Sequence, residues 1–156
     1  ETSTSVVAIS LLADEFSLNE LEKFWNRVVK KILVARRGKA FGIVVRWFGD
    51  SIFLGDEQYH GMVVWPRDIP YLIRLASTLG KQRVVKELID NLLEVLTTES
   101  AIFHINELYA LAEGENPYQR GFKDPVPVKN ISQLWNFPCD VILKALGILT
   151  EGNNNS

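Results

Sequence analysis

The chain has 156 residues, a length that fits one domain and allows a buried core. Hydrophobic residues make up 47% and charged residues 23%, as in an ordinary globular protein. The formal net charge of −2 leaves no electrostatic footprint for nucleic acid, and no apolar run reaches the roughly 18–20 residues of a membrane span. We therefore expect one domain over residues 1–156, a frayed polar tail at 151–156, and neither nucleic acid nor membrane as a partner.

The N-terminal segment and the single cysteine indicate where the protein works. Residues 1–16 lack a Met and a basic n-region, so they do not form a signal peptide, and we expect that the chain was cut from a longer one. One cysteine, Cys139, excludes an internal disulfide framework and is compatible with a reducing compartment. A cytoplasmic location follows as an expectation.

The first strong periodic signal is a helix that begins with a capping box. Ser17 and Glu20 have the S-x-x-E spacing of that motif. Apolar residues then recur at helical spacing at Leu18, Leu21, Trp25, Val28, Val29 and Ile32, and stop signals follow at Arg36, Arg37 and Gly38. The pattern predicts one helix up to these stop signals. Its end carries a basic cluster that the helix dipole favours: Lys30, Lys31, Arg36, Arg37 and Lys39.

Residues 40–64 differ in composition from the helical segment before them. Ile43 to Phe48 is rich in β-branched and aromatic residues, and Gly49-Asp50 offers a turn. Ile52 to Leu54 and Met62 to Val64 have the composition of short strands. The segment predicts an irregular region with a small β-hairpin.

Two further helices follow in direct succession. Pro66 opens the first and Gly80 ends it, while the second runs from about Gln82 to Leu96. Because only a short "LGKQ" joins them, they should form an antiparallel helical hairpin. The periodicity predicts a core that includes Trp25, Val28, Leu72, Leu75, Leu88 and Leu92.

The remainder reads as a long loop and a last helix. Residues 101–130 are broken by Gly114, Pro117, Gly121, Pro125 and Pro127, and their aromatic content favours a packed functional loop. A final helix is predicted from about Ser132 to Leu146, with a kink or restart at Pro138. The element order indicates a mainly helical protein with long connections on one side.

Single residues suggest chemistry without deciding it. His60 could be a general acid or base, a sugar ligand, or a hydrogen-bonded loop histidine. Glu107 lies among apolar neighbours, where desolvation would raise its pKa for proton transfer, or it faces water from a loop or helix start. Asp68 occupies the first turn of a helix, where an acid complements the dipole. The residues alone do not decide between these interpretations of His60, Glu107 and Asp68.

Several site classes find no support in the sequence. His104 and Cys139 have no ligand-spaced partners, so we expect no metal site. There is no G-x-S-x-G elbow, P-loop or Rossmann glycine pattern, and we expect no cofactor.

Four segments in order resemble a known family. The run Tyr59-His60-Gly61-Met62-Val63-Val64-Trp65-Pro66 resembles the Y-H-x-G-x-V-W-P segment of archaeal and bacterial glycogen debranching enzymes. "SLLADEFSLNELEKFWNRVVKKIL" is similar to that family's S-L-L segment, "INELYALAEGENPYQRG" to its Glu-containing segment, and "SQLWNF" to the start of its last helix. The resemblance covers roughly residues 10–146.

The resemblance implies a fold and a site. It implies part of an (α/α)6 toroid of antiparallel helical hairpins, with a small β-hairpin in a long loop. By position, Glu107 would be the catalytic base, and the sugar contacts would come from Tyr59, His60, Trp65, Asp68, Gln133 and Trp135. The implied function is that of a C-terminal fragment of an α-1,6-glucosidase acting on α-glucans or malto-oligosaccharides. The catalytic acid would lie upstream, so the chain alone should be inactive.

A second hypothesis is a non-catalytic interaction or regulatory domain derived from such an enzyme. An incomplete toroid leaves apolar helix faces uncovered, and these must meet the remainder of a parent chain or a second copy.

Overall fold

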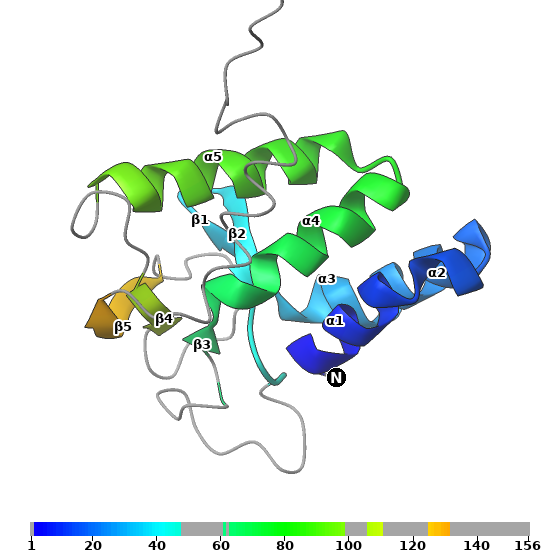
Figure 1. The fold of residues 1–156 in the computed structure, drawn as a ribbon, viewed down its shortest axis with the longest axis horizontal. Coiled ribbons are helices and arrows are strands. Elements are labelled where there is room, and N and C mark those ends of the chain that lie inside the picture. Colours follow the sequence, from blue (N-terminus) through cyan, green and yellow to red (C-terminus); the bar gives the residue numbers. More distant parts are fainter. Residues whose placement is uncertain (1, 48–60, 62, 99–105, 111–124, 132–156) are drawn as a thin grey trace, which may run out of the picture.

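The computed structural model describes residues 2–47, 61, 63–98, 106–110 and 125–131 (Figure 1). Its α-helices are α1 (Ser3–Leu11), α2 (Leu18–Phe24), α3 (Lys30–Ile32), α4 (Ile69–Thr78) and α5 (Gln82–Thr98). Short helical turns are η1 (Ala13–Glu15), η2 (Trp25–Val29, a π-helix) and η3 (Pro66–Asp68). The strands are β1 (Leu33–Arg36), β2 (Lys39–Ile43), β3 (Val63–Val64), β4 (Asn106–Ala110) and β5 (Val126–Ile131).

The predicted mainly helical class is confirmed, together with a small antiparallel sheet component. Helix α4 contacts both α5 and α1. Figure 1 shows that α4 and α5 run antiparallel and that α1 lies along α4. The chain reverses between α4 and α5 at Gly80, whose φ of 65° suits a residue without Cβ. The complete toroid stays a prediction.

The first predicted helix ends earlier than its stop signals indicate. The capping box at Ser17 and Glu20 forms, but the helix passes through the π segment and stops at Ile32. Leu33–Arg36 is instead the strand β1, paired with β2 through a two-residue turn in which Arg37 and Gly38 both have positive φ, 49° and 76°. Such turns match the twist of a hairpin.

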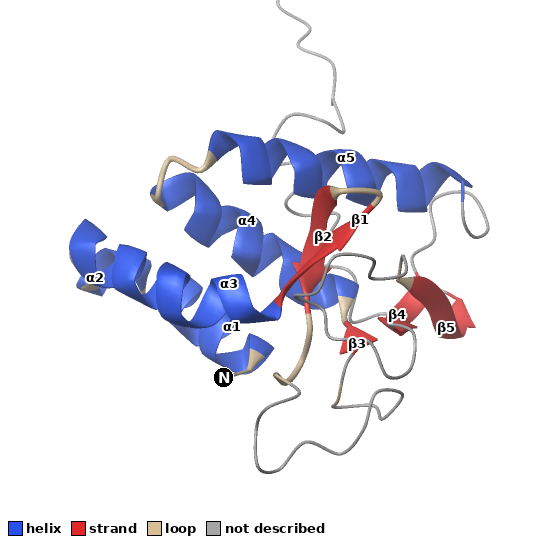
Figure 2. Cartoon of the chain, turned by 180° about the vertical axis from the view of Figure 1, so that it is seen from behind, coloured by secondary structure: helices blue, strands red, loops and turns tan. Residues whose placement is uncertain are grey.

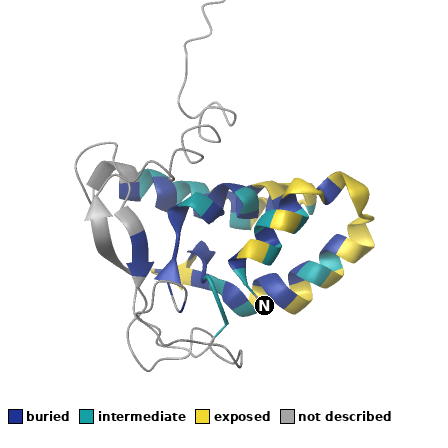
Figure 3. Cartoon of the chain, turned by 60° about the horizontal axis from the view of Figure 1, so that its bottom comes forward, coloured by how far each residue is buried: buried dark blue, intermediate teal, exposed yellow. Residues whose placement is uncertain are grey.

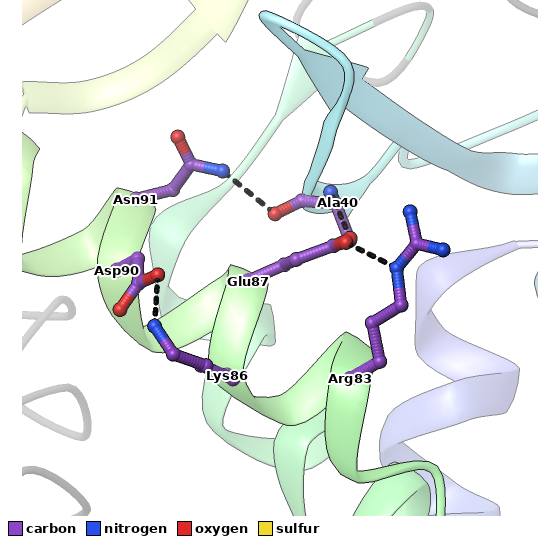
Figure 4. Close-up of polar contacts among 6 residues, drawn as sticks. All are labelled: Ala40, Arg83, Lys86, Glu87, Asp90 and Asn91. Carbon is purple, nitrogen blue, oxygen red and sulfur yellow. Dashed lines mark hydrogen bonds and ion pairs between the residues drawn. The ribbon is translucent and has the colours of Figure 1, made fainter.

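Contacts from a distant helix hold this hairpin. The N–H of Ala40 donates to Glu87 Oε2 at 2.9 Å, and its carbonyl accepts from Asn91 Nδ2 at 2.8 Å (Figure 4). Figure 2 shows the hairpin turn next to α5. Local periodicity carries no information about a contact partner some fifty positions away. For this reason the sequence pattern extended the predicted helix over residues that form β1.

The predicted long loop also contains regular structure. β4 and β5 lie within it and pair antiparallel with each other, and β4 pairs with β3 to give the order β3-β4-β5. The bridge between Val44 and Val64, with Val45 N–H donating to Val63 O at 3.0 Å, joins these strands to the end of β2. Short strands of this kind are stabilised by pairing and not by local preference, so the loop prediction was wrong at these residues.

The predicted core is confirmed: Trp25, Val28, Leu72, Leu75, Leu88 and Leu92 are all buried. Tyr109 of β4 completes it, with its ring centroid 5.0 Å from that of Phe41 in an edge-to-face arrangement. Figure 3 shows buried residues on β1, β2, β3 and the inner faces of the helices, and exposed residues on the outer helix faces. Helix α1, to which the sequence assigned no element, contacts α4, and its buried residues are Ser3, Val6 and Ser10.

Some predicted elements lie outside the described residues: the hairpin around Gly49-Asp50 and the last helix from Ser132 to Leu146. Within the described part of the chain, no helix combines the length and the apolar character that crossing a membrane requires.

Candidate functional site

The Trp-Pro-Arg-Asp segment forms a tight junction between β3 and α4. Trp65 is extended, Pro66 starts the 3-10 turn η3, and the N–H of Asp68 donates to Trp65 O at 3.0 Å. Proline suits this first helical position because its missing N–H would have no partner there. The junction therefore brings one aromatic, one cationic and one acidic side chain together within four residues.

Trp65 lies inside the protein with a cation over its ring. It is only 3% exposed and packs with Val63, Leu108 and Val45. The Arg67 guanidinium lies 3.9 Å from the centroid of the Trp65 ring, and the Arg67 side chain is 41% exposed. A sugar could stack on this face of Trp65 only after Arg67 moved away, so Arg67 is the group of this pair that a ligand meets first.

Asp68 is a buried carboxylate that interacts with a side chain of a different helix. It is 6% exposed, and burial raises its pKa, an effect opposed by a hydrogen bond with the Ser3 side chain of α1 and by the charge of Arg67. Arg67 Nε lies 3.7 Å from Asp68 Oδ1. Asp68 stands at the start of the helical segment, as predicted, but its side chain makes no capping bond to the backbone of α4.

Glu107 lies on the strand beside this junction. Val63 pairs with Ala110 and Val64 with Tyr109, and the register of β4 against β5 shifts between Asn106 and Leu108. β4 also contacts η3, and Leu108, the neighbour of Glu107, packs with Trp65. The backbone at position 107 is therefore adjacent to the Trp65–Asp68 turn, although the two are far apart in sequence.

The other predicted site residues, Tyr59, His60, Gln133 and Trp135, lie outside the described residues. Their convergence with Trp65 and Glu107 stays a prediction. Gly61, which follows His60 directly, is described and buried.

Two contributors to the junction, Arg67 and Ser3, were not among the predicted site residues. The signal for Arg67 is its place within the Trp-Pro-Arg-Asp segment, two positions after Trp65. Ser3 gave none, because its contact with Asp68 joins α1 to η3 across the fold. Among the described residues, no group of three or more His, Cys, Asp or Glu side chains could hold a metal ion.

The arrangement thus defines a mostly helical protein whose small sheet sets a glutamate-bearing strand against a Trp-Pro-Arg-Asp turn. Comparisons with models of known protein families, with curated proteins and with solved structures gave no match.

Proposed function

We propose that this chain is the C-terminal part of a debranching-type α-1,6-glucosidase that acts on α-glucans, and that it is inactive alone. The observation that supports this proposal best is the pairing of β3 with β4, which brings position 107 beside the turn at Trp65–Asp68. These are the two segments to which the family resemblance assigns the catalytic base and the sugar contacts.

The reaction would be an inverting hydrolysis. In such reactions a carboxylate removes a proton from the attacking water while a carboxylic acid protonates the glycosidic oxygen from the other face, the two lying roughly 6.5–9.5 Å apart. Glu107 would be the base. The acid would come from a part of the enzyme upstream of this chain.

The junction would bind the sugar through Arg67. Its guanidinium is held over the Trp65 ring and next to Asp68, so its donors are pre-oriented at a partly exposed position. Asp68, bonded to Ser3, would then act on the substrate by positioning Arg67. Trp65 would provide the rigid platform beneath it.

The test uses glucose release from panose or a limit dextrin by this chain, by the longer parent, and by the parent with Glu107→Gln. We expect turnover only in the unmodified parent, since removing one member of a cooperating catalytic unit can abolish most of the activity. Full activity of the Glu107→Gln parent would refute the assigned base. Binding of maltotetraose by that variant should persist.

A second candidate, a non-catalytic interaction domain, is favoured by one surface feature. Where α1 meets α2, four large apolar side chains are exposed: Leu11 at 53%, Leu12 at 53%, Phe16 at 36% and Leu18 at 63%. Clustered apolar exposure marks contact surfaces in many proteins.

A maltotetraose titration of the chain separates the two candidates. Binding at millimolar concentration that is lost in Arg67→Ala and kept in Arg74→Ala supports the glucan site, because Arg74 is an exposed arginine on α4 away from Trp65. Absence of binding supports the interaction domain.

A further inference from the structure

A second concave region lies on the hairpin side of the protein. A cavity of about 370 Å³ opens between the β1–β2 hairpin and the first turns of α5. Its lining is mainly apolar, with Leu33, Val34 and Ala35 from β1, Ala40 from β2, and Val84 from α5. The volume is in the lower part of the range of roughly 300–1,000 Å³ typical of binding pockets. None of the Trp65–Asp68 residues borders it.

The hairpin geometry shows which backbone groups face outward. Arg36 and Lys39 flank the two-residue turn, so the next pair, Ala35 and Ala40, is one whose N–H and C=O groups point away from the partner strand. The bonds from Ala40 to Glu87 and Asn91 are as this geometry requires. The register shifts between Val34 and Ala35, but Ala35 still pairs with Ala40, so its N–H and C=O point to the outer edge of β1. Ala35 is exposed.

The charges around this groove are arranged with cations outward. The side chains of Arg37, Arg83 and Lys86 are 63%, 86% and 76% exposed. Their carboxylate partners Glu94, Glu87 and Asp90 are only 35%, 17% and 37% exposed. Lys39 at the turn is also exposed. Each of these three cations is paired with a less exposed carboxylate, so a ligand that approaches the groove meets the cationic groups before their partners, above an apolar floor.

We propose that this groove binds an extended, acidic peptide segment of a partner protein, which adds to the outer edge of β1. Main-chain bonds to Ala35 would give affinity, as in other cases of strand addition to a sheet edge. An apolar side chain of the peptide would enter the cavity, and acidic side chains two positions away, on the same face of the added strand, would meet Arg83 and Lys39. The basic cluster at the end of the first predicted helix thereby acquires a role.

The experiment measures binding of a fluorescein-labelled heptapeptide, Thr-Asp-Thr-Leu-Thr-Glu-Thr, by fluorescence anisotropy. Its two acidic side chains stand two positions on either side of the central Leu and therefore share a face with it. Reversing one contacting charge should weaken binding by about tenfold or more, so Arg83→Glu should show that loss. Arg74→Glu makes the same charge change at an arginine on α4 and should bind like the unmodified chain. A peptide N-methylated at its central residues should bind at least about tenfold more weakly, because it lacks main-chain donors.

Further outcomes decide the proposal. Ala35→Pro removes the edge donor without removing a bond to β2, and it should also abolish binding if circular dichroism shows the variant folded. Equal loss in Arg74→Glu and Arg83→Glu would show unspecific charge attraction and overturn the proposal. Equally strong binding of a heptapeptide with Lys at every acidic position, or no binding of the acidic peptide at millimolar concentration, would overturn it as well.

Discussion

Asn91 of α5 donates a hydrogen bond of 2.8 Å from its side-chain amide to the carbonyl oxygen of Ala40 on β2. Asn91 is only 4% exposed, so this bond is made out of contact with bulk water. Replacing Asn91 with Ala leaves the Ala40 carbonyl without this donor. We expect the free energy of unfolding to fall by about 1–3 kcal/mol, measured by urea denaturation. Asn26→Ala, at an exposed position, should change it by less than about 0.5 kcal/mol. Equal effects of the two changes would contradict the role of this bond.

Leu88 tests the packing of α5 on the core. Its side chain is fully buried, whereas Leu18 is 63% exposed. Leu88→Ala should lower the free energy of unfolding by about 2–5 kcal/mol, because a cavity remains where the side chain was. Leu18→Ala removes the same atoms from a surface position, so its effect should stay below about 0.5 kcal/mol. A similar loss for both would mean that α5 does not pack as described.

Asp68 should make stability depend on pH with a definite sign. Burial raises its pKa in the folded protein, so its contribution is fully present below the unfolded-state pKa and is lost as pH rises through the folded-state pKa. Asp68→Asn removes this titration. The unfolding free energy of Asp68→Asn minus that of the unmodified chain should therefore increase with pH, measured from about pH 3 to about pH 7.

Asp90 offers a control of opposite sign. Its hydrogen bond with Lys86 lowers its pKa, so the unmodified chain should gain stability relative to Asp90→Asn as pH rises. The same slope for both variants would contradict the assignment of a buried carboxylate at Asp68.

Gly42 of β2 lies against Val64 of β3. A Cβ atom at this position would lie 2.5 Å from Val64 Cγ1 and 3.5 Å from Ile69 Cγ1, inside the packed core. Gly42→Ala should therefore lower the unfolding free energy by about 1–3 kcal/mol through overpacking. Adding Val64→Ala makes room for the new methyl group, so the two changes together should cost less than the sum of the single changes. Strict additivity would show that the two residues do not touch.

Much of the helical part could be predicted from sequence. Helix starts and ends depend on residues close together in the sequence, so a local pattern can predict them. Examples are the capping box of Ser17 and Glu20, Pro66 at a helix start and Gly80 at a helix end. The spacing of Leu72, Leu75, Leu88 and Leu92 predicted their burial for the same reason: a helix face that is apolar must be covered. Within the site, the grouping of Trp65, Arg67 and Asp68 also follows from adjacency along the chain.

The tertiary structure decided what depends on distant partners. Leu33–Arg36 continues an apolar pattern compatible with a helix, yet it is a strand because β2 pairs with it and α5 binds the backbone of β2 at Ala40. β4 and β5 are strands because they pair with each other and, through β4, with β3, and β4 contacts the turn η3. Asp68 has a raised pKa because folding buries it, an effect that its hydrogen bond with Ser3 of α1 opposes. Helix signals come from interactions three or four residues apart, whereas strand pairing and burial of a charge require segments that only folding brings together.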